Sequence, residues 1–281
     1  MNISRAGILW NHTKENGLPV VQKLAALLRE RGCIITADLE SAELLGCKRI
    51  IPGRNPECDV LFVLGGDGTL LSTLDYAVPY GIPIFGINLG RLGFLAETEP
   101  DELETDLERL FTGDFWYEDR MTMTVEGAED SFFALNEIVI SRRSPSTGLI
   151  TVEIEANGVP LDRISGDGLI IASSTGSTGY SLSAGGPIVA PGLDCFVMTP
   201  VCPHTMHARP IVASADERIT IKVIDKPYAA CAVFDGRSTY NFTREDPGFS
   251  IVRSRRSERF IRMHKRNYFE VLQSKLSAWT H

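Results

Sequence analysis

The sequence predicts an α/β N-terminal domain followed by a β-sandwich-like C-terminal domain. Strand-like and helix-like segments alternate over residues 1–118, short strand-like runs fill residues 119–264, and a helical pattern returns at residues 265–281. The first pattern is typical of a mainly parallel sheet with helices on both faces, and the second is typical of a β-sandwich. We expect the last helix to pack back on the first domain.

Each element of the first domain has its own signal. A strand is expected at residues 6–10, and a helix over LPVVQKLAALLRER, residues 18–31, because its apolar residues recur at helical spacing. Further elements are expected, in chain order, as strands at 33–36, 60–64 and 82–87 and as helices at about 69–78 and 100–110.

The second domain is expected to consist of short strands bounded by turn residues. Such runs occupy residues 121–127, 131–142, 149–158, 168–174, 195–201, 218–225, 228–236 and 249–254. The last segment, NYFEVLQSKLSAW at 267–279, has the pattern of a helix.

Composition limits the class of protein. The chain has 281 residues, 43% of them hydrophobic and 23% charged, and a formal net charge of -8. No apolar run approaches the ~18 residues of a membrane span, and the N-terminus lacks an export signal, so we expect a cytoplasmic protein. The six cysteines include no C-x-x-C pair, which favours reduced thiols. The acidic balance argues against a nucleic-acid partner.

A glycine-rich turn follows the strand expected at 60–64. In open α/β sheets, ligands bind at the carboxyl ends of strands, where backbone N–H groups and the next helix N-terminus attract phosphate. The residues expected to bind phosphate are Gly65, Gly66, Gly68 and Thr69. A tight turn with Asp67 as helix N-cap explains the same residues equally well. The turn is neither a Walker loop nor G-x-G-x-x-G.

A second segment rich in glycine and hydroxyl residues spans residues 166–192. Small residues let backbone and side-chain donors surround a polar ligand such as ribose or pyrophosphate. A serine-rich surface loop is the plain alternative, although Tyr180 and Leu182 favour an ordered segment. A nucleophilic serine is a further alternative, but Thr175 stands where the G-x-S-x-G elbow around Ser177 requires glycine.

Several stretches together resemble the bacterial NAD kinase family (ATP/polyphosphate-dependent NAD kinases). LGGDGTLL at 64–71 is similar to the family's GGDGT motif, NLGRLGFLAE at 88–97 to its N-x-G-x-L-G-F-L segment, and ALNEIVI at 134–140 to its N-E motif. The long stretch at 167–189 resembles the D-G…T-G-S-T-A-Y-S-L-S-A-G-G-P signature. Residues 200–212 and 269–279 extend the resemblance nearly to the C-terminus.

The resemblance implies transfer of the γ-phosphoryl group of ATP to the 2′-hydroxyl of the adenosine ribose of NAD, giving NADP. It also implies magnesium with ATP, polyphosphate as donor for some members, and a homodimer or homotetramer. The implied fold is a Rossmann-like N-terminal domain and a C-terminal β-sandwich. A lipid kinase of the diacylglycerol or sphingosine type shares GGDGT and is the first alternative. A non-catalytic NAD(H)-binding sensor is the second.

The resemblance also assigns site residues. A ribose hydroxyl is a weak nucleophile, so a carboxylate that orients it and accepts its proton suits Asp67 as the catalytic residue. The implied NAD contacts are Asp67, Gly68, Asn136, Glu137, Asp167, Thr178, Gly179, Tyr180, Ser181, Leu182 and Ser183. We predict no residue that binds a metal directly. Asn136 and Glu137 taken alone also fit an ordinary polar strand end.

The chain departs from the family pattern at three places. Gly179 replaces an alanine, Ser165 replaces a frequent basic residue with Arg163 as the nearest substitute, and Arg237 stands in D-G-R where D-G-Q or D-G-N is usual. Arg163 and Arg237 are therefore secondary site candidates, and His204 is a third because it belongs to the matching stretch at 200–212.

Two other features have plain explanations. His204 and His207 lie three residues apart, but a zinc site would need ligands that the sequence does not supply, so a structural or site-lining role is favoured for His204. The basic run at 253–266 is expected to be a solvated face, with electrostatic guidance of ATP or polyphosphate as the functional alternative.

Overall fold

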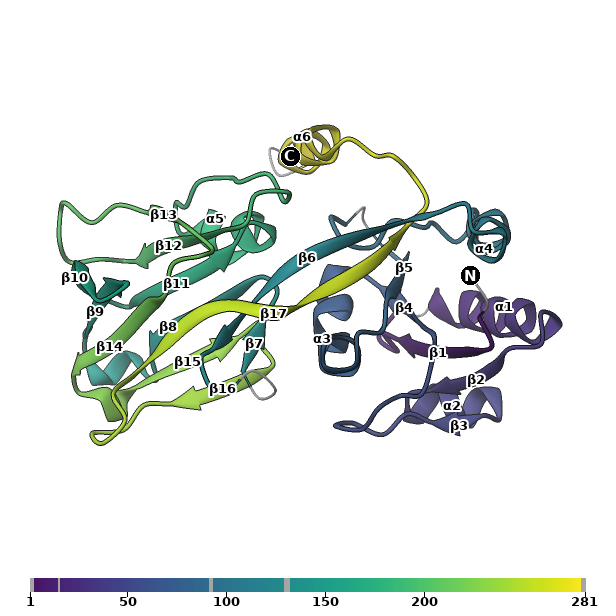
Figure 1. Cartoon of the computed structure of the whole chain (residues 1–281), viewed down its shortest axis with the longest axis horizontal. Helices are drawn as coiled ribbons and strands as arrows, with labels where there is room; N and C mark the ends of the chain where they lie inside the picture. The colour runs from purple at the N-terminus through teal and green to yellow at the C-terminus, as the bar shows by residue number, and fades with distance from the viewer. Residues whose placement is uncertain (1–2, 15, 91–92, 129–131, 279–281) are drawn as a thin grey trace. The chain divides into compact units, whose positions relative to one another are not determined.

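The structure, a computed structural model, describes residues 3–14, 16–90, 93–128 and 132–278 (Figure 1). The chain forms two compact units. Unit 1 consists of residues 1–119 and 258–281, and unit 2 consists of residues 120–257. The chain therefore leaves unit 1 after Asp119 and returns to it at Glu258.

Unit 1 contains a parallel sheet with the strand order β3-β2-β1-β4-β5, which is the order of one half of a Rossmann fold. The strands are β1 (Arg5–Trp10), β2 (Ile34–Ala37), β3 (Lys48–Arg49), β4 (Val60–Gly65) and β5 (Ile84–Asn88). The helices are α1 (Gly17–Glu30), α2 (Leu39–Leu45), α3 (Asp67–Ala77), α4 (Leu103–Thr112) and α6 (Tyr268–Ala278).

Strand β4 lies inside this sheet and is buried along its whole length. Val60, Phe62 and Leu64 belong to a hydrophobic cluster that also contains residues of α1 and α4. Because side chains alternate along a strand, Leu61 and Val63 face the other side of the sheet, and α3 packs against β4. An uninterrupted apolar run is what a strand covered on both faces requires.

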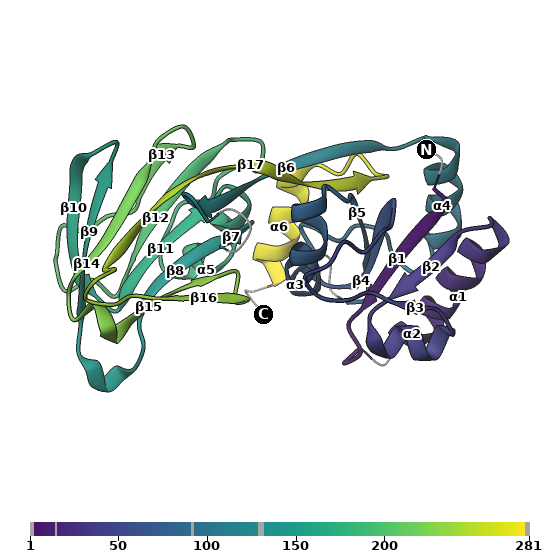
Figure 2. The ribbon, with the colours of Figure 1, turned by 60° about the horizontal axis from the view of Figure 1, so that its bottom comes forward.

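Unit 2 is a sandwich of two antiparallel sheets (Figure 2). One sheet has the order β13-β12-β11-β8-β15-β16, formed by Ile211–Ser214, Cys195–Val201, Gly168–Ser173, Glu137–Arg142, Ala230–Phe234 and Ser238–Asn241. The other has the order β10-β9-β14-β17, formed by Val159–Gly166, Ile150–Ala156, Ile219–Asp225 and Gly248–Arg262. One hydrophobic core includes residues from both sheets, so their inner faces pack together.

Two strands continue across the boundary between the units. β6 (Trp116–Val125) pairs with β17 and with the short β7 (Phe133–Ala134). The end of β17 pairs in parallel with β5 of unit 1 through Phe260 and Ile84. Single turns complete the described elements: α5 (Tyr180–Ser183) and the 3-10 turns Val78–Tyr80, Pro145–Thr147, Thr175–Thr178 and Pro227–Ala229.

The observed fold confirms the predicted class, an α/β Rossmann-like unit and a β-sandwich, and differs from the prediction in detail. The element α2 was not expected; it is short, and Asp38 caps it by accepting the N–H of Ser41. β10 was also missed because its first residues, 159–161, are exposed and include Pro160, as an edge strand that pairs only with β9 allows.

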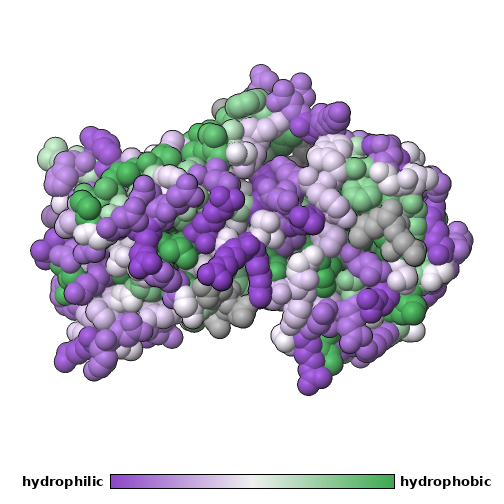
Figure 3. Space-filling view, viewed as in Figure 1, coloured by the Kyte–Doolittle hydropathy of each residue, from purple (hydrophilic) through white to green (hydrophobic). Residues whose placement is uncertain are grey.

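Hydrophilic and hydrophobic residues alternate in small patches on the face shown in Figure 3. Within the described residues, no helix combines the length and the hydropathy needed to span a membrane.

Candidate functional site

The glycine-rich turn joins β4 to α3 at the carboxyl end of the parallel sheet. Gly66 is the N-cap of α3, and Asp67 is its first helical residue. The N–H groups of Thr69 and Leu70 donate to the Gly66 carbonyl at 2.9 and 3.2 Å. The alternative in which Asp67 caps the helix is therefore wrong. No side chain caps α3, and an uncapped helix N-terminus attracts anions.

The glycines of this turn serve two different purposes. A Cβ at Gly65 would collide with the side chain of Thr69, so packing inside the turn requires glycine there. A Cβ at Gly66 or Gly68 would meet no atom of the described residues within 4 Å. These two positions leave the backbone open to a ligand; phosphate binding by this turn stays a prediction.

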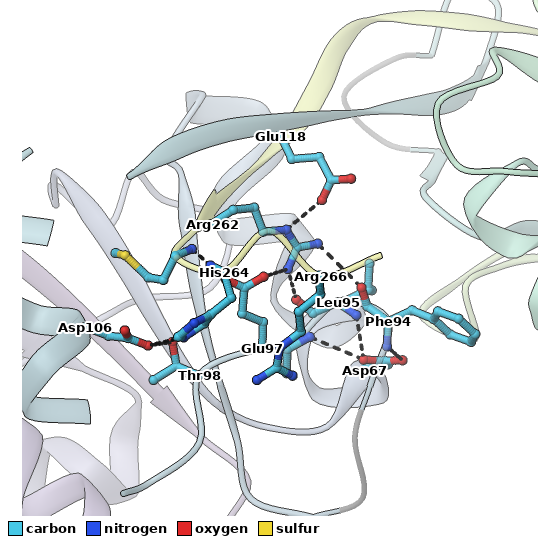
Figure 4. Close-up of polar contacts among 12 residues, drawn as sticks. Asp67, Phe94, Leu95, Glu97, Thr98, Asp106, Glu118, Arg262, His264 and Arg266 are labelled. Carbon is cyan, nitrogen blue, oxygen red and sulfur yellow. Dashed lines mark hydrogen bonds and ion pairs between the residues drawn. The ribbon is translucent and has the colours of Figure 1, made fainter. Parts of the chain in front are cut away.

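The loop after β5 holds the Asp67 carboxylate (Figure 4). The N–H groups of Phe94 and Leu95 donate to it at 2.8 and 3.0 Å, and the N–H of Ala96 lies at 3.4 Å. A Cβ on Gly93 would collide with this carboxylate, which explains the glycine at that position. Backbone donors therefore fix the orientation of Asp67.

Asp67 also faces a cation from the far end of the chain. The Nζ atom of Lys275 in α6 lies 3.4 Å from Oδ2 of Asp67 and 4.1 Å from the ring centre of Phe94. The side chain of Asp67 remains 27% exposed, so one part of the carboxylate is open to a substrate. Both residues belong to unit 1.

The buried side chain of Arg262 supports the loop that holds Asp67 (Figure 4). Arg262, near the end of β17, is 7% exposed and donates to the Leu95 carbonyl at 2.6 Å. Its guanidinium pairs with Glu118 at 2.6 Å and with Glu97 at 3.6 Å. Leu95 therefore donates its N–H to Asp67 while its carbonyl is held by Arg262. The Arg262 guanidinium and the Asp67 carboxylate thus bind the two backbone polar groups of one residue, the carbonyl and the N–H of Leu95.

The expectation of a solvated face for residues 253–266 is wrong at Arg262. Arg253 and Arg259 are roughly half exposed and pair with Asp194 and Asp119. Arg262 points inward because strand alternation places it on the same side as buried Phe260.

A second polar cluster lies at the turn that follows β17. The carboxylate of Asp106 is buried, accepts the hydroxyl of Thr98 at 2.9 Å, and lies 3.0 Å from Nε2 of His264. Asp106, His264 and Glu102 form a group whose possible ligand atoms lie within 4.8 Å of one another. Arg109 and Arg266 lie 3.8 and 3.7 Å from the two carboxylates and balance their charge. The cluster ties the chain after β17 to α4.

In unit 2, the Asn136–Glu137 segment is held by a buried carboxylate. Asp235 accepts the N–H groups of Leu135, Asn136 and Glu137 at 2.6, 2.9 and 2.9 Å. Burial raises the pKa of Asp235, and these donors and Arg237 at 3.8 Å oppose that rise. Asp235 has a φ of 47°, so the D-G-R turn places it in a left-handed conformation.

Arg237 does not extend toward solvent. Its guanidinium donates to the Phe133 carbonyl at 3.0 Å and stacks 4.7 Å from the centre of the Phe133 ring. It therefore braces the strand before Asn136.

Two polar atoms of the segment lack partners. Oδ1 of Asn136 and Oε2 of Glu137 are buried and accept no hydrogen bond within the described chain. Burial, and then the charge of Asp235, raise the pKa of Glu137 to about 7. Unpaired buried acceptors are costly, so both atoms suit hydrogen-bond donors from a ligand.

The 175–183 segment lies against the same place. A Cβ at Gly176 would collide with the backbone of Asn136, and a Cβ at Gly179 would meet Oε2 of Glu137 at 2.9 Å. The N–H of Tyr180 donates to Glu137, while its side chain is 47% exposed. The structure therefore brings Asn136, Glu137, Gly179 and Tyr180 together.

The hydroxyls in this segment differ in their accessibility. Ser181 is buried and bonds with Thr199 at 2.8 Å, which makes its hydroxyl part of the core. Ser177 is also buried, and its hydroxyl bonds to the backbone of Ser174 and Val189, which disfavours a nucleophilic serine. Thr178 and Leu182 are partly exposed, and Ser183 is exposed.

The remaining predicted residues lie at the other end of β11. Asp167 forms an ion pair with Arg142 at 3.0 Å. Arg163 is exposed and lies 3.8 Å from Glu153. His204 is exposed, and its N–H donates to the Ser165 carbonyl at 2.8 Å. These residues are separated along β11 from the Asn136–Glu137 end of the sheet.

Sequence reasoning missed the supporting residues. Arg262 and Lys275 contact the Asp67 loop, and Asp235 holds the Asn136 segment. The available signals were an arginine among apolar residues at the end of a strand and an acid directly before a glycine turn.

The fold and the site fit a small-molecule kinase, because a Rossmann-like sheet carries an oriented carboxylate beside an open glycine turn. Residues 6–115 match the ATP-NAD kinase N-terminal domain family, and residues 135–263 match the ATP-NAD kinase C-terminal domain family. The chain therefore belongs to the NAD kinase family, and its activity is that of an NAD kinase.

Curated relatives and solved structures support the same family. The chain is 34% identical to the NAD kinase of Natranaerobius thermophilus, with 97% of both chains covered, and 40% identical to that of Geobacter sulfurreducens, with 92% of both covered. The structure of an NAD kinase from Archaeoglobus fulgidus in complex with ATP matches at a TM-score of 0.77 and 29% identity, covering 96% of this chain and 99% of that one. Yeast NADH kinase complexed with NADH shares the fold at a TM-score of 0.87 and 21% identity, covering 99% of this chain and 89% of the yeast chain.

Proposed function

We propose that this chain transfers the γ-phosphoryl group of ATP to the 2′-hydroxyl of the adenosine ribose of NAD, and that Asp67 orients this hydroxyl and accepts its proton. The observation that carries the assignment is the Asp67 carboxylate, fixed by the 94–96 backbone yet partly exposed beside the open Gly66–Gly68 turn. A fixed carboxylate needs no reorganisation when the proton moves.

The glycine-rich turn and Lys275 supply positive charge next to the Asp67 carboxylate. Backbone N–H groups at the start of α3 and the Lys275 ammonium, 3.4 Å from Asp67, attract the oxygens of the transferring phosphoryl group. This attraction offsets the repulsion between the phosphate and the carboxylate.

Magnesium fits the site as an ion carried by the nucleotide. The group of described residues with metal-ligand spacing is Glu102, Asp106 and His264, and it does not include Asp67. Mg²⁺ binds largely through substrate phosphates and water, so the nucleotide would carry the ion to the site without a dedicated protein ligand. When bound, the ion neutralises phosphate charge.

For the acceptor, we propose contacts at the second unit. The unpartnered Oδ1 of Asn136 and Oε2 of Glu137 accept hydroxyl or amide protons of NAD, and the exposed ring of Tyr180 packs on the ligand. Asp167, Gly68, Thr178, Gly179, Leu182 and Ser183 remain proposed contacts, and for Ser181 we propose its backbone. A cytoplasmic homo-oligomer, a homodimer or a homotetramer, is proposed on the family resemblance and is checked by light scattering.

The test is a donor and acceptor panel with the purified protein. ATP, other nucleotides and polyphosphate are each combined with Mg²⁺ and with NAD, NADH, diacylglycerol or sphingosine. We expect NADP from ATP and NAD. Phosphorylated lipid without NADP would support the lipid kinase alternative, and NAD binding without product would support a sensor.

A further inference from the structure

A pocket of about 280 Å³ lies in unit 1 at the carboxyl ends of β1 and β2, where the start of α3 forms its third wall. Its lining residues are Leu9, Trp10, His12, Asp38, Leu39, Glu40, Thr69, Ser72, Thr73 and Tyr76. In doubly wound sheets, nucleotides bind outside the carboxyl ends of the strands next to the point where the strand order reverses. β1 lies between β2 and β4, so the pocket is at that point.

The lining favours an uncharged, partly apolar ligand that carries hydrogen-bond donors. None of the lining residues is a lysine or arginine, whereas Asp38 and Glu40 are acidic. Trp10 and His12 supply aromatic surface, with ring centres 4.3 Å apart, and Tyr76 adds a third ring. A phosphate would be repelled here, but a purine and a ribose would find apolar walls and acceptors.

Asp38 and Glu40 differ in the number of hydrogen bonds that they already accept. Asp38 accepts the N–H of Trp10 at 3.1 Å and that of Ser41 at 2.8 Å, and it lies 3.0 Å from Nε2 of His12. Glu40 is 69% exposed and lies 3.1 Å from Nδ1 of His12. Glu40 is therefore the more adjustable acceptor, suited to ribose hydroxyls.

The pocket is continuous with the glycine-rich turn. Thr69 lines the pocket and is also a residue of the turn, where its hydroxyl accepts a hydrogen bond from Asn11 at 3.2 Å. The pocket volume is near the lower end of the ~300–1,000 Å³ of ligand sites. It therefore fits a nucleoside, while phosphates attached to that nucleoside reach the open Gly66–Gly68 backbone.

We propose that this pocket binds the nucleoside of the phosphoryl donor, with its phosphates on the glycine-rich turn. The proposal rests on the proposed use of ATP as donor and separates the donor subsite from the NAD contacts at Asn136 and Glu137.

The test blocks the pocket with one side chain. Ser72 lines the pocket from α3 and is exposed, so Ser72→Trp adds bulk without disturbing the core. Asp75→Trp is the matched control, because Asp75 is exposed on the same helix but does not line the pocket. We expect Ser72→Trp to raise the KM for ATP by about tenfold or more and to leave the KM for NAD unchanged. Asp75→Trp should leave both unchanged.

A binding measurement makes the test independent of turnover. Adenosine and AMP are titrated by calorimetry into the wild type and both variants, each saturated with NAD so that the acceptor contacts are occupied, and inorganic tripolyphosphate serves as the probe without a nucleoside. We expect Ser72→Trp to weaken adenosine and AMP and to spare tripolyphosphate. An unchanged KM for ATP together with unchanged adenosine binding overturns the proposal, as does a rise in the KM for NAD alone. A wild type that binds adenosine at the pocket but makes no NADP contradicts the proposed function instead.

Discussion

Asp67 and Asp235 have nearly the same hydrogen bonds but different surroundings. Each carboxylate faces three consecutive backbone N–H groups, from residues 94–96 and 135–137, and each has a cation within 4 Å. Asp67 is 27% exposed, whereas the side chain of Asp235 is fully buried. Exposure separates the two carboxylates: Asp67 is open to a ligand, whereas Asp235 can only hold the 135–137 backbone.

The strongest test of this comparison is Asp67→Asn. The amide keeps the size of the side chain but cannot accept the ribose proton. We expect kcat to fall by about 10²–10⁴-fold, with the Kd for NAD nearly unchanged. Steady-state kinetics and NAD calorimetry measure the two effects. The exposed Asp75→Asn on the same helix is the control, and wild-type turnover in Asp67→Asn would rule out the catalytic role.

Asp235→Ala should affect folding first. Three backbone N–H groups would lose their buried acceptor, and alanine would have to adopt a φ of 47°. We expect the free energy of unfolding to fall by about 3 kcal/mol or more, measured by urea denaturation. Asp235→Asn keeps an acceptor and tolerates the conformation, so it should lose less. A loss below about 1 kcal/mol for the alanine variant would contradict a structural role.

Arg262 tests whether the loop that orients Asp67 needs its support. Arg262→Met removes the donor to the Leu95 carbonyl, so we expect kcat to fall roughly tenfold with an unchanged KM for NAD. Arg262→Lys should restore part of kcat. The control is Arg259→Lys in the same strand, whose exposed ion pair contributes little. A change in KM without a change in kcat would show that Arg262 does not act through Asp67.

The smallest effect concerns pH and Glu137. Its pKa in the folded chain is about 7, above the ordinary 4.5, because burial and Asp235 disfavour its charge. The folded state therefore binds this proton more tightly, and its stabilisation is complete below about pH 4.5 and is lost as pH rises through about 7. The slope is at most about 1.4 kcal/mol per pH unit.

Glu137→Gln isolates this contribution. Other buried acids, such as Glu258, have raised pKa values and act in the same direction, so the informative quantity is the wild-type slope minus the variant slope. Urea unfolding from pH 5 to 8 measures it. Equal slopes would show that Glu137 does not titrate in this window.

The sequence predicted what depends on local patterns. The fully apolar β4 and the glycines after it lie within a few residues of one another, so they reveal a buried strand and an open turn. Asn136 and Glu137, by contrast, were assigned from the family resemblance, because taken alone they fit a polar strand end; Glu137 begins β8.

The rest depends on contacts between distant residues. Arg262 reaches Leu95 across 167 positions, and Lys275 reaches Asp67 across 208, so no local pattern signals either contact. The first residues of β10 are exposed and include Pro160, which obscures the strand pattern and is tolerated because β10 pairs with β9 on one side only. Asp235 was passed over because its role appears only when the turn lies beneath the 135–137 backbone.

Because unit 1 is completed by residues 258–281, the order of synthesis matters. The ribosome translates all of unit 2 before it reaches Arg262 and Lys275, which contact Leu95 and Asp67. The N-terminal part of unit 1, residues 1–119, therefore stays incomplete until residues 258–281 have been synthesised. A protease that removed this tail would take away Arg262 and Lys275, and with them two contacts to the segment around Asp67.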